Sequence, residues 1–279
     1  MDGTTVAREA VEGASRLQEL TALAWRHGDL AGQDLLRPFL APGPSGGQPG
    51  RIALVSSFGT ESALLLALAA ELDPGVPVIF LDTGKLFGET LRYRDRLVAL
   101  LGLRDVRSVT PDPARLAALD PSGTLWLGDP DACCHVRKVE PLARALAGFE
   151  IWVSGRKRYQ GPSRAALPTI EIVDGRLKLN PLAPWSRERI AAEFARRNLP
   201  PHPLEADGFL SIGCMPCTAR VQPGEAERAG RWRNSDKTEC GIHWPGPSGP
   251  GPSGPGPSGP GPSGPGAASR PSTSDTGDG

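Results

Sequence analysis

The chain has 279 residues, with 31 basic and 31 acidic side chains and a formal net charge of zero. This balance gives no overall attraction to nucleic acid or to an anionic membrane, so we expect neither as a partner. The longest apolar run, residues 63–70, is too short to cross a bilayer, and the acidic N-terminus is unlike a secretory signal, so a cytoplasmic protein is expected.

The first 45 residues are expected to form an N-terminal helical segment. Apolar side chains recur near one face of a helix over residues 6–25. A joint rich in proline and glycine, "APGPSGGQPG" over residues 41–50, separates this helix from the rest of the chain.

Residues 46–205 are expected to form one α/β domain. Four apolar segments are typical of strands: "RIALVSS", "VPVIFLDT", "DVRSVT" and "IWVSG". Two segments between them are typical of helices: "ALLLALAAEL" and "ETLRYRDRLVALLGL". Such alternation predicts a doubly wound, mostly parallel sheet covered on both faces. Alternating residues around Asp174-Gly175 then predict a hairpin, and Ser186 can cap a helix that runs to about Asn198.

The remaining residues differ from this domain in hydrophobic periodicity and in composition. Residues 206–244 show little periodicity yet contain three of the five cysteines, and we interpret them as a functional C-terminal arm. Residues 245–279 contain almost nothing apolar and are predicted to be a disordered tail. The glycines of this tail repeat over five residues, which excludes a collagen strand.

Basic side chains gather over residues 137–164, where seven of them face only Glu140 and Glu150. The seven are Arg137, Lys138, Arg144, Arg156, Lys157, Arg158 and Arg164. This surplus would suit a polyanionic small ligand, although a solvated basic face explains the charge pattern equally well.

The segment "SSFGTES", residues 56–62, lies where the first expected sheet strand meets its helix. Small residues let the backbone close around phosphate oxygens, and a helix N-terminus directs free N–H groups there. The pattern lacks the Gly-Lys-Ser/Thr of a Walker loop, and many strand-to-helix turns use glycine and serine only as turn and cap residues.

Four cysteines form two close pairs, Cys133 and Cys134 in "DACCHVRK" and Cys214 and Cys217 in "GCMPC". In a reducing compartment, such pairs suggest a metal site rather than disulfides, and four thiolates suit either zinc or an iron–sulfur cluster. Adjacent cysteines strain the chelation of a single zinc ion, whereas a cubane spreads its ligands over several irons. We therefore favour [4Fe–4S].

The fifth cysteine, Cys240, stands alone in "KTECGIHW". Lys237 and His243 could stabilise a thiolate there, and Glu239 opposes them. An isolated cysteine is more often inert, so this residue gains its meaning from the rest of the chain.

Taken together, these segments resemble the adenylyl-sulfate/phosphoadenylyl-sulfate reductase family, in its assimilatory, iron–sulfur-containing, thioredoxin-dependent branch. The resemblance covers roughly residues 51–244. It is carried by "SSFGTES", "LDTGKLFGETLRYRD", "CCHVRKVEPL", "WVSGRKRYQGPSR", "IGCMPC", "ERAGRW" and "KTECGIHW". It implies an adenine-nucleotide α-hydrolase-like fold, close to the ATP pyrophosphatases, in which residues 46–205 bind the nucleotide and residues 206–244 form a flexible catalytic arm.

The resemblance also implies a role for individual residues. The [4Fe–4S] ligands would be Cys133, Cys134, Cys214 and Cys217, and Lys138 would lie near both cluster and substrate sulfate. The substrate phosphate would lie against Ser56, Ser57 and Gly59, while phosphate and sulfate would also contact Arg164, Arg228, Arg231 and His243. Cys240 would be the catalytic nucleophile.

The implied reaction reduces adenylyl sulfate to sulfite and AMP in sulfate assimilation, on the route to cysteine. Cys240 would carry an S-sulfo group that reduced thioredoxin, or a glutaredoxin-like donor, then resolves. Three alternatives stay open: reduction of 3′-phosphoadenylyl sulfate or of both nucleotides, ATP-dependent adenylation on the same fold, and a zinc-stabilised binding module.

Overall fold

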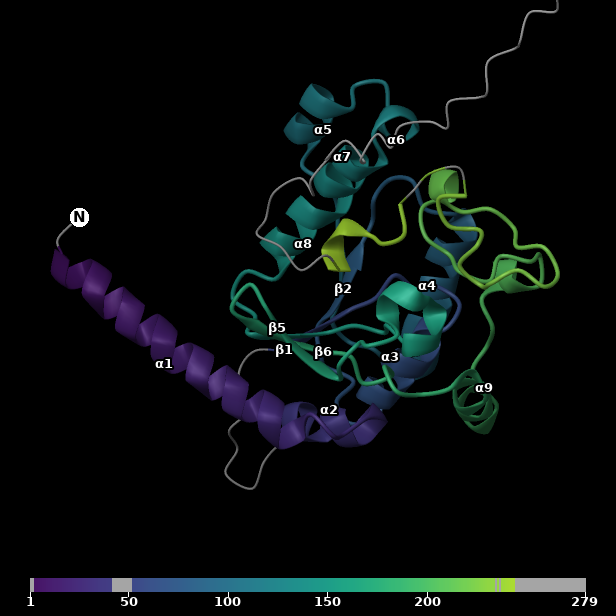
Figure 1. Ribbon diagram of the computed structural model, residues 1–279. Helices are drawn as coiled ribbons and strands as arrows, with labels where there is room; N and C mark the ends of the chain where they lie inside the picture. The colour runs from purple at the N-terminus through teal and green to yellow at the C-terminus, as the bar shows by residue number, and fades with distance from the viewer. Residues whose placement is uncertain (1–2, 42–51, 234, 236, 244–279) are drawn as a thin grey trace, which may run out of the picture.

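The computed structural model describes residues 3–41, 52–233, 235 and 237–243 (Figure 1). The expected joint after Ala41 and the expected disordered tail, residues 245–279, lie outside these described residues. Within them, one six-stranded sheet has the order β3-β2-β1-β4-β6-β5.

The strands of this sheet are short and lie close to the predicted segments. They are β1 (Ile52–Val55), β2 (Val78–Leu81), β3 (Val106–Val109), β4 (Ile151–Val153), β5 (Ile170–Val173) and β6 (Arg176–Leu179). The helices are α1 (Gly3–His27), α2 (Gly32–Leu40), α3 (Ser62–Ala70), α4 (Gly88–Leu101), α5 (Pro113–Leu119), α6 (Leu125–Gly128), α7 (Pro130–Cys134), α8 (Glu140–Ala145) and α9 (Arg187–Arg196).

The sheet is parallel except at one edge. Strand β1 lies between β2 and β4 and is parallel to both. The chain first winds from β1 through β2 to β3, and then returns to the other side of β1 to form β4. The strand order therefore reverses between β1 and β4, which is the place where open α/β sheets bind their ligands.

The predicted hairpin is confirmed, and it joins the same sheet. Strand β6 is parallel to β4, and β5 pairs with β6 in the antiparallel direction as the sheet's edge. Asp174 and Gly175 both have positive φ, 49° and 68°, as a two-residue turn of this kind requires.

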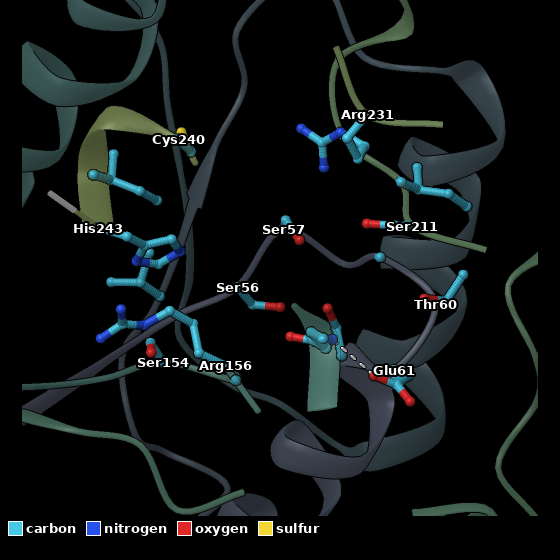
Figure 2. Close-up of a pocket in the computed structure, with 18 of the residues that line it drawn as sticks. Ser56, Ser57, Thr60, Glu61, Ser154, Arg156, Ser211, Arg231, Cys240 and His243 are labelled. Carbon is cyan, nitrogen blue, oxygen red and sulfur yellow. Dashed lines mark hydrogen bonds between the residues drawn. The ribbon is translucent and has the colours of Figure 1, made fainter. Parts of the chain in front are cut away.

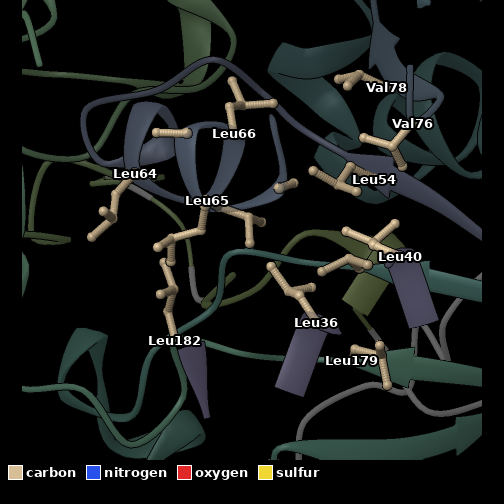
Figure 3. Close-up of a cluster of buried hydrophobic side chains, with 14 of the residues drawn as sticks. Leu36, Leu40, Leu54, Leu64, Leu65, Leu66, Val76, Val78, Leu179 and Leu182 are labelled. Carbon is tan, nitrogen blue, oxygen red and sulfur yellow. The ribbon is translucent and has the colours of Figure 1, made fainter. Parts of the chain in front are cut away.

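Helices cover both faces of the sheet, as predicted. On one face, leucines of α2 and α3 pack with β1 and β6 in the main core (Figure 3). On the other face, Leu142 and Leu146, in and just after α8, pack against Ala53, Ile79 and Trp152. Each fully buried leucine contributes about 2 kcal/mol of hydrophobic free energy, so both layers stabilise the sheet.

The N-terminal segment contains two helices where the sequence predicted one. The predicted helix over residues 6–25 is confirmed as α1, whose N-terminal part extends away from the body of the protein (Figure 1). A second helix, α2, follows and buries Leu35, Leu36, Phe39 and Leu40. Within the described residues, no helix is both long and apolar enough to span a membrane.

A buried histidine gives the fold a predicted sensitivity to acid. The His202 ring lies 4.8 Å from the Tyr93 ring, its Nδ1 accepts a hydrogen bond from the Leu204 amide, and its Nε2 lies 3.2 Å from the Thr90 hydroxyl. Burial lowers the pKa of His202 to about 4. The unfolded chain therefore binds the extra proton first, at a pKa of about 6.5, and stability falls as the pH drops from about 6.5 towards 4.

We expect the melting temperature to fall between pH 7.5 and pH 5, and to fall less in His202→Gln, which has no proton to gain. Thermal melts at both pH values check this. An equal fall in the two proteins would assign the acid sensitivity to other groups.

Candidate active site

A cavity of about 190 Å³ opens at the carboxyl ends of the parallel strands. Its wall includes Val55 at the end of β1, Leu81 at the end of β2, and Ser154 directly after β4. The cavity therefore lies at the reversal of strand order between β1 and β4.

The segment between β1 and α3 forms one side of this cavity. The Ser56 hydroxyl accepts a hydrogen bond from the Phe58 amide at 3.1 Å, and Phe58 has a positive φ of 49°. The Phe58 side chain is buried against Phe80, with ring centroids 5.4 Å apart. This buried anchor turns Ser56, Ser57 and Gly59 towards the cavity.

Glu61 ties the same loop to the segment after β4. Its carboxylate accepts hydrogen bonds from Lys157 Nζ at 2.7 Å, Gln160 Nε2 at 3.0 Å and the Tyr159 hydroxyl. Burial alone would raise the pKa of Glu61, but the charge and hydrogen bond of Lys157 hold it below its usual range. Losing one partner of a buried pair typically costs about 3–5 kcal/mol, so this contact fixes the loop.

Arginines form the opposite side of the cavity. Arg231 lies 4.4 Å from the centre of the Trp232 ring, and a Cβ at Gly213 would clash with its guanidinium. Figure 2 shows Arg231 and Ser211 facing Ser57 across the cavity. Arg164 and Arg228 also line it, beside the carboxylate of Glu239.

His243 lies on the same side as Cys240 (Figure 2). Its ring is parallel to that of Trp152, with centroids 6.4 Å apart, and Lys178 Nζ lies 4.6 Å from the centre of the same tryptophan ring. Burial, and then the charge of Lys178, hold the pKa of His243 well below its usual range. Its buried Nδ1 has no hydrogen-bond partner among the described residues, and His243 lines the cavity.

Cys240 is buried at the cavity edge, directly before a 3₁₀ turn, Gly241–His243. A hydrogen bond from the Cys134 thiol, then the charge of Lys138, lower the pKa of Cys240 well below its usual range. The pKa of Cys134 rises in return. Burial would lower the pKa of Lys138, but Cys240, Cys214 and Cys134 raise it, so the ammonium lies among three thiols. Cys240 is therefore suited to be a thiolate.

A second, smaller cavity is lined by all four of the paired cysteines. Lys138 and Arg231, which line the first cavity, also line this one. Cys133 and Cys134 end helix α7 and lead into a π-helical turn, His135–Val139, a rare conformation that is frequent at functional sites. Cys214 comes directly before the 3₁₀ turn Met215–Cys217, and Cys217 is its last residue. The Met215 amide donates a hydrogen bond to the Lys85 carbonyl at 2.7 Å, which holds this turn in place.

Cysteine thiolates are the ligands that zinc and iron–sulfur groups take in proteins, and these four line one small cavity. All five cysteines of the chain are described and none forms a disulfide. Burial raises the pKa of Cys133 and of Cys217, as expected for thiols whose negative charge lacks a full set of partners. Among the described residues, no group of three or more His, Cys, Asp or Glu side chains is arranged to hold a metal ion.

The structure brings the predicted site residues together. The cavity is lined by every residue that the sequence assigned to substrate or catalysis: Ser56, Ser57, Gly59, Lys138, Arg164, Arg228, Arg231, Cys240 and His243. Sequence reasoning missed the buried anchor Glu61–Lys157 and the position of Glu239 against Arg164. All four residues lie inside the quoted motifs, but nothing in the motifs indicates which charges pair.

Comparison with known proteins places the chain in a family. The family model described as phosphoadenosine phosphosulfate reductase domain matches residues 51–220. The chain belongs to this family. A relative from Mesorhizobium japonicum named adenosine 5′-phosphosulfate reductase is 55% identical over 195 residues, which cover 70% of this chain and 77% of the relative.

Other members of the reductase family carry a different name. A protein of Gloeobacter violaceus named phosphoadenosine 5′-phosphosulfate reductase is 40% identical over 202 residues, covering 69% of this chain and 82% of that protein. The crystal structure of phosphoadenylyl-sulfate reductase from Candida auris, a phosphate complex, superposes with a TM-score of 0.59 at 24% identity, covering 73% of this chain and 97% of that one. This similarity confirms the α/β fold with its mostly parallel sheet.

Proposed function

We propose that the protein reduces adenylyl sulfate to sulfite and AMP in assimilatory sulfate reduction, on the route to cysteine. The observation that carries this proposal is the position of Cys240, a buried thiol, at the edge of a cavity that is also lined by arginines, Lys138 and small loop residues. An anionic nucleotide with an electrophilic sulfur matches such a site, because the cations neutralise its oxygens and the thiolate attacks the sulfur.

The first step transfers the sulfo group to the protein. The Cys240 thiolate attacks the sulfur of adenylyl sulfate, an S–S bond forms, and the bond from sulfur to the phosphate oxygen breaks. AMP leaves with the electron pair, and Cys240 carries an S-sulfo group. The phosphate lies against Ser56, Ser57 and Gly59, and the sulfo oxygens face Lys138, Arg231 and His243.

The second step uses a dithiol donor, for which thioredoxin or a glutaredoxin-like protein is suited. A donor thiolate attacks the Cys240 sulfur, and sulfite leaves with the electron pair of the S–S bond. The second donor thiol then attacks its neighbour in the mixed disulfide and releases the Cys240 thiolate. The donor loses two electrons, which the sulfur gains. Because free thiols and a reduced donor are needed, we assign the reaction to the cytoplasm.

Cys133, Cys134, Cys214 and Cys217 are the residues that would hold a [4Fe–4S] cluster. The bound cluster would supply a compact anionic group next to Lys138, with a structural and electrostatic role. Lys138 then orients towards the cavity from its place between the cysteines and Cys240. In this proposal, residues 46–205 bind the nucleotide and residues 206–244 contribute cluster ligands and the nucleophile.

Substrate choice is tested by turnover with each nucleotide. We expect sulfite release from adenylyl sulfate with reduced thioredoxin, and a kcat/KM at least about tenfold lower with 3′-phosphoadenylyl sulfate, because an added phosphate needs its own paired cations. The Gloeobacter relative makes the second nucleotide the competing candidate. Equal or higher kcat/KM with the 3′-phosphorylated substrate would overturn the assignment.

A further inference from the structure

Glu239, the residue before Cys240, pairs with two arginines of the cavity. Its carboxylate accepts hydrogen bonds from Arg164 Nε at 2.5 Å and Nη2 at 2.8 Å, and Arg228 Nη2 lies 3.6 Å away. The side chains of Arg164 and Glu239 are only 7% and 11% exposed. Such a two-pronged, desolvated contact is the strong form of an ion pair.

The two arginines hold the terminal segment by more than this carboxylate. Arg228 Nη2 also donates to the Thr238 carbonyl at 3.0 Å. The third nitrogen of Arg164, Nη1, donates to Gln160 Oε1 at 2.5 Å, so every nitrogen of this guanidinium already has a protein partner. Arg164 and Arg228 therefore fasten Thr238 and Glu239 in the position that buries Cys240.

An incoming anion needs the same guanidinium groups. The edge of Arg164 that binds a carboxylate in two places also matches a sulfate or phosphate, and one edge cannot bind both in this way. Binding of a substrate anion to Arg164 must therefore weaken its contact with Glu239.

We propose that Glu239 is an internal competitor of the substrate anion: it fastens the segment that carries Cys240 through Arg164 and Arg228, and an oxyanion bound there displaces Glu239 and loosens this segment while Cys240 still lines the cavity. The displacement half of this inference rests on the proposed role of the two arginines in binding the substrate. The loosened contact leaves Cys240 at the cavity for the first step and lets the same buried thiol become accessible to a donor protein in the second.

The test compares the wild type with Glu239→Gln, in protein prepared without oxygen and with matched iron content. The control is Glu225→Gln, which removes one carboxylate from the same region, at an exposed pair with Arg233. The readouts are the rate of Cys240 alkylation by iodoacetamide, followed by peptide mass spectrometry, and the affinity for AMP. Inorganic sulfate is the small-anion probe.

We expect Cys240 of Glu239→Gln to be alkylated at least about fivefold faster than in the wild type without any anion, and AMP to bind several-fold more tightly. Sulfate should accelerate alkylation of the wild type and of Glu225→Gln in a saturable way, and leave the already fast variant unchanged. The wild-type sulfate dependence needs no substitution, so it also tests the inference if Glu239→Gln folds poorly.

One outcome would overturn the proposed competition: Glu239→Gln is alkylated faster, but its AMP affinity is unchanged and sulfate has no effect on the wild type. Glu239 would then hold the segment in place without competing with an anion. Equal rates of Cys240 alkylation in all three proteins would show that the Glu239 contact does not keep Cys240 buried. Turnover is measured separately: a wild type that consumes no adenylyl sulfate contradicts the proposed function, whereas the alkylation rates without nucleotide still report on the Glu239 contact.

Discussion

Cys240→Ser is expected to lower the turnover of adenylyl sulfate by at least about 1,000-fold, because a neutral hydroxyl is a far weaker nucleophile towards sulfur than a thiolate. The charge of the neighbouring Lys138 ammonium favours the thiolate form of Cys240 in the wild type. The measurement that isolates the step is intact-protein mass spectrometry after anaerobic incubation with adenylyl sulfate and no thioredoxin.

The wild type should gain the mass of one SO₃ group, about 80 Da, and lose it when reduced thioredoxin is added. Thr238→Ser is the control, because it changes only an exposed side chain and keeps the carbonyl that Arg228 contacts. This variant should behave like the wild type. A mass gain in Cys240→Ser would show that another residue is the nucleophile, and the proposed mechanism would be wrong.

Cys217→Ser is expected to remove most of the bound iron and to lower turnover by at least about 100-fold, because serine is a poor ligand for the iron of such clusters. Cys217 is half-buried at the end of a short turn, so this substitution disturbs packing less than one at a fully buried cysteine. Iron and acid-labile sulfide per chain are measured in protein purified without oxygen.

Cys240→Ser is the matched control for this experiment, since it removes a cysteine that is not an expected ligand and should keep its iron. The two substitutions should therefore separate cluster content from nucleophilic chemistry. Unchanged iron and sulfide in Cys217→Ser would contradict the ligand assignment. One zinc per chain in the wild type, without iron, would favour the single-metal alternative.

The elements that the sequence predicted well are those with a strong local signal. The helix over residues 6–25, the buried strands and the Asp174-Gly175 turn depend on periodicity and turn chemistry within a few residues. Helix α2 was missed, because its Pro38 and neighbouring glycines obscure the pattern, and its leucines are buried by packing against α3 rather than by propensity. The placement of β6 beside β4 is a long-range pairing that the hairpin signal does not contain.

The candidate site divides in the same way. Motif residues could be named from the sequence because glycine- and serine-rich turns, paired cysteines and the terminal Glu-Cys-Gly-Ile-His are local patterns. Their mutual contact could not be derived locally: Cys134 packs with Cys240 in one cluster but lies more than a hundred residues away in the chain. Chain order places no limit on which side chains share a cavity.

The sequence by itself determined the chemistry available to this protein: which thiols, cations and loop residues it has, and which strands can carry them. Only the tertiary structure decided which cations remain for a ligand. In the basic stretch of residues 137–164, Arg137 pairs with Asp120, Lys157 with Glu61 and Arg164 with Glu239. All three acidic partners lie outside this stretch of the chain. Charges interact over a few ångströms in space, so the local excess of basic residues could not show which of them were already neutralised.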